Sequence, residues 1–71
     1  MPYVNVRITR DGVTREQKAE VIAEMTETLQ RVLGKQPALT HIVIDEVDTD
    51  NWGVAGKSTT VLRARAPRGE P

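Results

Sequence analysis

Few residues in this 71-residue sequence can carry out chemistry, and the clearest candidate is Pro2. The chain has no cysteine, which excludes thiol nucleophiles, disulfides and thiolate metal sites, and its only histidine is His41. Asp45 and Glu46 are adjacent, so on a strand they point to opposite faces and cannot act as a carboxylate pair. The acidic segment that begins at Asp48 lacks the glycine and the trailing glutamate of an EF-hand loop. We therefore expect no metal site.

Pro2 follows the initiating methionine, which aminopeptidases remove when the next residue is small. The mature chain would then begin with a secondary amine. In a dry pocket near cations the protonated amine is disfavoured, and its pKa falls toward neutrality. Such a base is suited to taking a proton from the carbon next to a carbonyl group. A Met-Pro start is also common where the proline has no chemical role, so the residue alone leaves both interpretations open.

Residues 3–9 predict the strand that positions Pro2. Three apolar residues alternate with polar ones along this segment, the period of a half-buried strand: Val4, Val6 and Ile8. The Asp11-Gly12 pair is a turn signal that ends the strand.

A helix is predicted to follow the turn. Thr14 and Gln17 have the spacing of a capping box, and Gly34 is a typical helix-terminating glycine. One face carries an apolar stripe that we expect to be core, formed by Val21, Ile22, Met25, Leu29, Val32 and Leu33. Another face, with Glu20, Glu24, Glu27 and Arg31, is expected to face solvent.

A second strand is predicted from His41 to Val47. Its uninterrupted apolar centre, residues 42–44, is typical of a strand buried on both faces of a parallel sheet. Strand, helix and strand then form one βαβ unit with a right-handed crossover. Residues 48–56 are predicted as a polar loop, and residues 58–63 as a short edge strand or hairpin arm.

The length and charge of the chain limit its organisation. We expect a single domain over residues 2–63 and a disordered tail over residues 64–71. One βαβ unit cannot cover both faces of its sheet, and a core this small needs reinforcement, so we expect an oligomer. Ten basic residues balance ten acidic ones, which argues against nucleic-acid or membrane partners. With no membrane-length apolar run and no signal-peptide core, the expectation is a cytoplasmic protein.

Three segments together resemble the 4-oxalocrotonate tautomerase family: Pro2 opening an alternating strand, the Thr-Arg-Glu-Gln-Lys helix start at residues 14–18, and Glu46 followed by Asn-Trp-Gly-Val-Ala-Gly-Lys at residues 51–57. The resemblance covers roughly residues 2–63. It implies an α+β fold, a small β-α-β subunit with a C-terminal hairpin arm, which pairs into dimers and then into a hexamer of three dimers. It also implies that Pro2 is a general acid/base acting on 2-oxo acids and enols, with no cofactor or metal.

The resemblance also assigns substrate-binding residues. Trp52 stands where the family has an aromatic residue that walls the pocket, and its alternative role is a plain interface anchor. The two arginines of the family's prototype are not preserved: Val13 follows the first turn's glycine, and His41 stands at the second position. Arg10 and Arg15 flank the turn and can substitute for them. His41 can bind a carbonyl or carboxylate group, or it can be a strand-end histidine at a subunit contact.

These residues predict an isomerase that moves a proton between carbon and oxygen of an enol or 2-oxo acid. Without the prototype arginines, we expect a preference for substrates with one carboxylate, such as phenylpyruvate-type enols, over the dicarboxylate 2-hydroxymuconate. Two alternatives stay open. The same base can serve a lyase or hydratase by activating water or a carbon nucleophile, or the chain can be a catalytically idle assembly protein.

Overall fold

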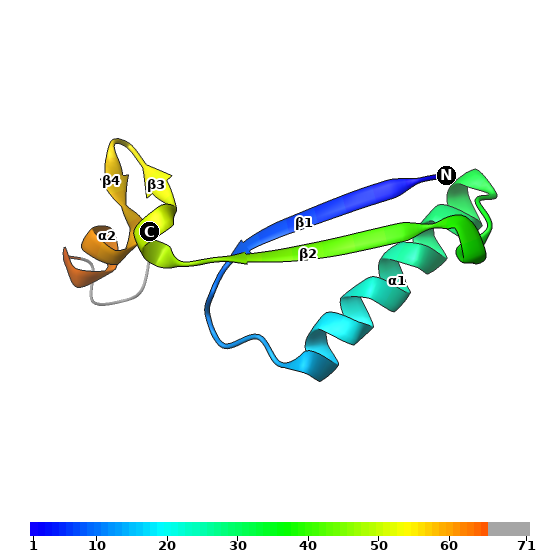
Figure 1. Cartoon of the computed structure of the whole chain (residues 1–71), viewed down its shortest axis with the longest axis horizontal. Coiled ribbons are helices and arrows are strands. Elements are labelled where there is room, and N and C mark those ends of the chain that lie inside the picture. The colour runs from blue at the N-terminus through cyan, green and yellow to red at the C-terminus, as the bar shows by residue number, and fades with distance from the viewer. Residues whose placement is uncertain (66–71) are drawn as a thin grey trace. The chain divides into compact units, whose positions relative to one another are not determined.

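The computed structural model describes residues 1–65, which form two compact units. The first unit consists of Met1–Arg7 and Gly12–Asp45, and the second of Ile8–Asp11 and residues 46–65. Strand β1 (Tyr3–Thr9) and strand β2 (His41–Val47) pair with each other, and their arrows point the same way in Figure 1. Both predicted strands are confirmed with the expected limits.

Backbone hydrogen bonds close this sheet at its two ends. The amide of His41 donates to the carbonyl oxygen of Pro2 at 2.9 Å, and the amide of Arg10 donates to the carbonyl oxygen of Val47 at 2.8 Å. The starts of the two strands therefore lie side by side, and so do their ends, as a parallel pair requires. The predicted β-α-β order is confirmed.

Helix α1 (Arg15–Leu33) joins the two strands and begins and ends where its capping residues predict. The hydroxyl oxygen of Thr14 accepts from the Gln17 amide at 3.1 Å, and the Gln17 side chain accepts from the Thr14 amide at 2.9 Å. Gly34 ends the helix in the left-handed region with φ of 70°, which a residue without Cβ adopts at little cost. A short 3-10 turn, η1 (Pro37–Leu39), then leads into β2.

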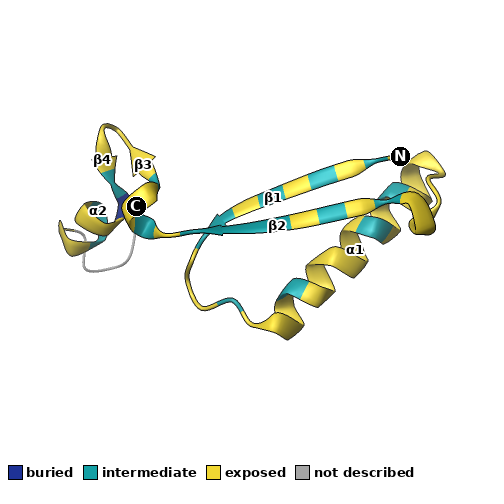
Figure 2. Cartoon of the chain, viewed as in Figure 1, coloured by how far each residue is buried: buried dark blue, intermediate teal, exposed yellow. Residues whose placement is uncertain are grey.

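One face of the β1–β2 sheet is covered and the other is open. Exposure alternates along most of β1, where Val4 and Val6 are half-buried between exposed neighbours (Figure 2). In β2 it alternates only from His41 to Ile44, and residues 44–47 are all half-buried. Val43 is 40% exposed, so the prediction that β2 is buried on both faces is wrong for the single chain. The physical reason is that one helix and two strands make only two layers.

The predicted core stripe of α1 is not buried in the single chain. Leu29 is half-buried, but Ile22 is 41% and Val32 62% exposed. No apolar side chain among residues 1–65 is fully buried. A two-stranded sheet is too narrow to cover a stripe five turns long, which leaves this surface without a partner. None of the helices within the described residues is long and apolar enough to cross a membrane.

The second unit contains a hairpin and a short helix. A 3-10 turn, η2 (Thr49–Asn51), precedes antiparallel strands β3 (Gly53–Val54) and β4 (Lys57–Ser58). The two residues between the strands, Ala55 and Gly56, have φ of 53° and 80°. Two successive positive φ values are the signature of a type I′ turn, whose twist suits a two-residue hairpin. A hairpin is thus present, but it lies at residues 53–58, mostly within the segment predicted as a polar loop, and not at residues 58–63 where the arm was predicted.

The chain continues from the hairpin as helix α2 (Thr59–Arg65), not as the predicted strand. The Ser58 hydroxyl oxygen accepts from the Val61 amide at 3.3 Å, which caps the first turn and outweighs the strand preference of Thr-Thr-Val. Residues 64 and 65, expected in the tail, are helical. Residues 66–71, the rest of the predicted tail, lie outside the described residues.

Candidate active site

Pro2 and His41 are adjacent at one end of the first unit. Pro2 precedes β1 and is half-buried, and its carbonyl oxygen accepts the 2.9 Å hydrogen bond from the His41 amide. His41 opens β2 and is exposed. The parallel pairing of two strand starts therefore brings the backbones of the predicted base and of the only histidine in the sequence into contact.

Arg15 lies at the other end of the first unit. It is the first residue of α1, whose 19 residues span about 28 Å at 1.5 Å per residue. The helix runs from Arg15 to the turn that leads into His41, so its far end is the one near the N-terminus in Figure 1. Arg15 and Pro2 of the same chain therefore do not share a site.

Arg10 and Trp52 belong to the second unit. Arg10 is exposed and directly follows β1, whereas Pro2 directly precedes it. Trp52 is half-buried between η2 and β3, and its carbonyl oxygen accepts from the Thr59 amide at 2.7 Å. Among the predicted site residues of the first unit, Pro2 and His41 are in backbone contact, and Arg15 is distant from both.

An ion pair that sequence reasoning missed lies in the turn after β1. Arg63 of α2 donates to the two carboxylate oxygens of Asp11 at 2.5 and 3.2 Å. These hydrogen bonds, and then one from Thr9, lower the pKa of Asp11 to about 2. The carboxylate of Asp11 is therefore engaged within the second unit. The sequence separates Asp11 and Arg63 by 52 residues, so no local pattern could have paired them.

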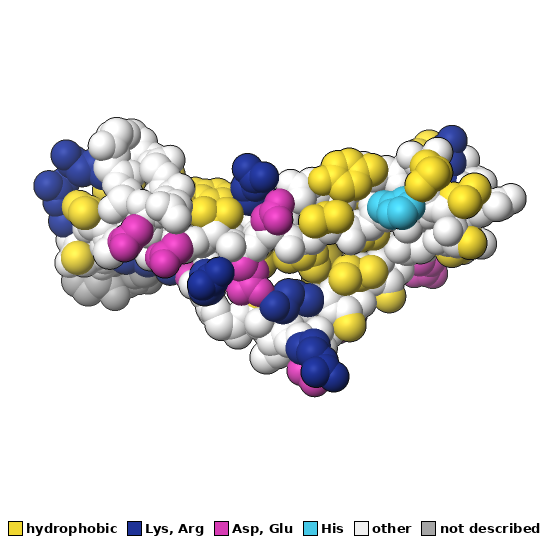
Figure 3. All heavy atoms as spheres, in the orientation of Figure 1, with side chains coloured by type: hydrophobic (Ala, Val, Ile, Leu, Met, Phe, Trp, Pro, Cys, Tyr) yellow, Lys and Arg dark blue, Asp and Glu magenta, His cyan; other side chains and the backbone are white. Residues whose placement is uncertain are grey.

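The open face of the sheet carries a second polar cluster. The Asn5 side chain donates to a carboxylate oxygen of Asp45 at 2.8 Å, and Arg7 reaches the same oxygen at 3.5 Å. The hydrogen bond from Asn5, followed by that from Arg7, lowers the pKa of Asp45. Apolar side chains lie around the histidine on the face seen in Figure 3. Tyr3, next to Pro2 in the chain, is 64% exposed. The open face thus combines exposed apolar side chains with a polar cluster whose members hydrogen-bond to one another.

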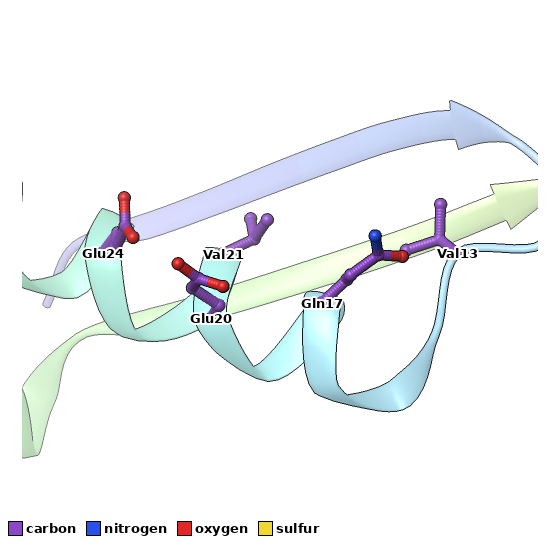
Figure 4. A pocket seen from close by; sticks show the side chains of 5 residues that line it. All are labelled: Val13, Gln17, Glu20, Val21 and Glu24. Atoms are coloured by element: carbon purple, nitrogen blue, oxygen red, sulfur yellow. The ribbon is translucent and has the colours of Figure 1, made fainter.

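A hollow of about 390 Å³ lies along α1 and contains none of the predicted site residues (Figure 4). Its lining is Val13, Gln17, Glu20, Val21 and Glu24. Hydrogen bonding to the Glu20 side chain, and secondly its negative charge, raises the pKa of Glu24. Two carboxyl groups this close repel an anionic 2-oxo acid, so the hollow does not suit the substrate class that the sequence predicts.

Acidic residues elsewhere are used as hydrogen-bond acceptors. Asp48 accepts from the Asp50 amide at 3.2 Å, and Asp50 accepts from the Thr60 hydroxyl at 2.5 Å. Among the residues that the structure describes, no group of three or more histidine or acidic side chains could hold a metal ion.

The first unit has a β-α-β order, and Pro2 directly precedes its first strand. The sequence model of the family described as "Tautomerase enzyme" matches residues 2–62, and the chain belongs to this family. A relative named "Probable tautomerase K2", from Dickeya dadantii, is 58% identical over 93% of this chain and 98% of its own length. The predicted resemblance is confirmed, and membership supports an isomerase-class, tautomerase-type activity.

Solved structures agree with this assignment. A 4-oxalocrotonate tautomerase isozyme from Methylibium petroleiphilum superposes with a TM-score of 0.83 at 30% identity, covering 90% of this chain and 98% of that one. A heterohexamer 4-oxalocrotonate tautomerase from Chloroflexus aurantiacus gives a TM-score of 0.78 at 27% identity, covering 89% and 100%. The predicted α+β, β-α-β fold is confirmed.

Proposed function

We propose that this protein is a tautomerase that moves a proton between carbon and oxygen of a 2-oxo acid or its enol, with Pro2 as the base. The observation that carries the proposal is the half-buried Pro2 beside His41 at the start of β1, in a chain of the tautomerase family. Met1 is 82% exposed, which leaves it accessible to an aminopeptidase. Its removal converts the amide nitrogen of Pro2 into a secondary amine.

The reaction needs a neutral amine near pH 7. Partial burial of Pro2 and the charge of an arginine from a neighbouring subunit would both disfavour the protonated amine, so their effects on its pKa add. The neutral nitrogen takes a proton from the enol hydroxyl or from the carbon next to the carbonyl group, and the ammonium returns it at the other position. No group has to be oxidised or reduced, so the chemistry requires no cofactor.

Substrate binding is assigned to four residues. Arg10 and Arg15 bind the carboxylate, because a guanidinium donates two parallel hydrogen bonds to it. His41 donates a hydrogen bond to the carbonyl or carboxylate, and Trp52 excludes water. The absence of arginine at positions 13 and 41 favours substrates with a single carboxylate.

Arg15 and Pro2 come together only if several copies of the chain assemble. Arg15 lies a helix length away from Pro2 in its own chain, and the open sheet face and the α1 stripe both lack partners. We expect a homohexamer, three dimers that cover both surfaces and supply Arg15 from a neighbouring subunit. The heterohexameric relative from Chloroflexus aurantiacus supports this arrangement.

The decisive experiment compares chains that differ only at the amino terminus. Mass spectrometry first identifies preparations with and without Met1, and each is assayed for ketonisation of phenylpyruvate enol and of 2-hydroxymuconate. We expect the preparation that retains Met1 to lose activity by at least about 100-fold, the lower end of a general base's contribution. Pro2→Ala, which keeps a primary amine, should lose only part of the rate.

The pH dependence gives a second signature. Below the pKa of the Pro2 amine the nitrogen is protonated and cannot accept a proton, so kcat/KM should fall on the acid side with a single ionisation. Circular dichroism and sedimentation of the Met1-retaining chain serve as controls and should match those of the processed chain. Equal rates for the two preparations would show that Pro2 is not the base.

A further inference from the structure

Thr59 differs from every other residue that the structure describes, because its relative exposure is 0%. It is the first residue of α2 and directly follows β4, at the point where the hairpin turns into a helix. A buried hydroxyl costs free energy unless it forms a hydrogen bond. The partner of this hydroxyl therefore indicates what the residue does.

Both hydrogen-bond donors of Thr59 are directed at the carbonyl oxygen of Trp52. The backbone amide donates at 2.7 Å and the side-chain hydroxyl at 2.9 Å. The hydrogen bond from the Thr59 amide extends the hairpin ladder by one step beyond the Gly53–Ser58 pair. The hydrogen bond from the Thr59 hydroxyl occupies the second lone pair of the same oxygen. The peptide group that follows Trp52 is thus held by two bonds from one residue.

The next residue of α2 holds the turn that precedes Trp52. The Thr60 hydroxyl donates to a carboxylate oxygen of Asp50 at 2.5 Å and lies 2.6 Å from the Thr49 hydroxyl. The Trp52 amide in turn donates to the Thr49 carbonyl oxygen at 3.4 Å. The chain is therefore held by α2 on both sides of the only tryptophan in the sequence.

We propose that Thr59 is a positioning residue for the tautomerase reaction: its hydroxyl fixes the backbone at Trp52, and so fixes the indole that walls the substrate pocket. This inference rests on the proposed function for its effect on catalysis, but not for its effect on Trp52. Without the hydroxyl, the Trp52 carbonyl oxygen accepts only the hydrogen bond from the Thr59 amide, and the loop before β3 becomes more mobile. We expect weaker substrate binding and poorer exclusion of water from the pocket.

Two matched pairs isolate the hydroxyl group. Thr59→Val keeps the size of the side chain and removes the hydroxyl, and wild type is its reference. Thr59→Ser and Thr59→Ala differ from each other by the hydroxyl alone, and this pair remains informative if valine prevents folding. Thr26→Val is the control, because the Thr26 hydroxyl also donates to a backbone carbonyl, that of Ile22 at 2.8 Å, within α1.

Tryptophan fluorescence reads the position of Trp52 without requiring activity. We expect Thr59→Val and Thr59→Ala to shift the emission to longer wavelength and to increase quenching by acrylamide. Thr59→Ser and Thr26→Val should resemble wild type. Unchanged emission and quenching in both hydroxyl-deleted variants would overturn the proposal.

Kinetics then test the consequence for the reaction. In Thr59→Val and Thr59→Ala we expect KM to rise about 3- to 10-fold, the range that corresponds to one hydrogen bond of roughly 1 kcal/mol. The acid limb of kcat/KM should move to higher pH, because water admitted to the pocket raises the pKa of the Pro2 amine. Altered fluorescence with unchanged kinetics in an active enzyme would overturn the catalytic part. Inactivity of the processed wild type would instead refute the proposed function, and fluorescence would still decide the role of Thr59.

Discussion

The two units of the chain are stabilised in different ways. In the first unit, regular strands and a five-turn helix leave large apolar side chains mostly exposed, with Tyr3 64% and Val32 62% accessible, whereas Val61 of the second unit is 42% accessible. In the second unit, short elements are joined by side-chain hydrogen bonds and by the Asp11–Arg63 ion pair. We therefore expect the first unit to depend more on other copies of the chain than the second, which has its own polar contacts.

The largest expected effect comes from a charge on the open sheet face. Val43→Asp places a carboxylate where we expect a subunit contact, and an uncompensated buried charge costs about 3–5 kcal/mol. Sedimentation velocity should show that the oligomer dissociates, and urea unfolding should show lower stability. Val61→Asp is the matched control, since Val61 of α2 is 42% exposed and belongs to the locally held unit. If both variants stay assembled, the open face is not a subunit contact.

An intermediate effect is expected at the hairpin turn. Ala55 has φ of 53°, which costs an L-residue about 1–2 kcal/mol, and glycine avoids this cost while losing about 0.5–1 kcal/mol of chain entropy. Ala55→Gly should therefore stabilise the protein by about 0.5–1 kcal/mol in urea unfolding. The same change at Ala23, inside α1, should destabilise it by about 1 kcal/mol. A loss of stability at position 55 would contradict the strain assigned to this turn.

The smallest effect concerns the acidic face of α1. The raised pKa of Glu24 means that the folded chain holds this proton more tightly than the unfolded chain does. The repulsion from Glu20 thus appears as the pH rises through that pKa and is absent at lower pH. Glu24→Gln should raise the melting temperature slightly at pH 7 and not near pH 3.

Glu16→Gln is the control, because we expect it to change the melting temperature in the opposite direction. Glu16 lies in the first turn of α1, where a negative charge interacts favourably with the helix dipole. Its replacement should lower the melting temperature at pH 7. Stabilisation by both substitutions would point to the net charge of the chain, and not to the Glu20–Glu24 contact, as the cause.

Part of the candidate site could be predicted from the sequence, and part could not. The contact between Pro2 and His41 follows from sequence, because two parallel strands predicted to start at residues 3 and 41 must have neighbouring starts. Nothing in the sequence pattern indicated a role for Thr59. As part of a strand, residues 59 and 60 would point to opposite faces, whereas in α2 they hold the chain on both sides of Trp52. The nearest available signal was the capping serine at position 58.

The sequence alone determined the limits of β1, α1 and β2, because each depends on local physics. Alternation sets a strand, the Thr14–Gln17 capping box starts a helix, and Gly34 ends it without a Cβ penalty. Tertiary structure decided the helical form of residues 59–65, the pairing of Asp11 with Arg63 and the exposure of Val43 and the α1 stripe. Those outcomes depend on groups far apart in the chain, and on how many layers are available to cover an apolar face, which no local pattern encodes.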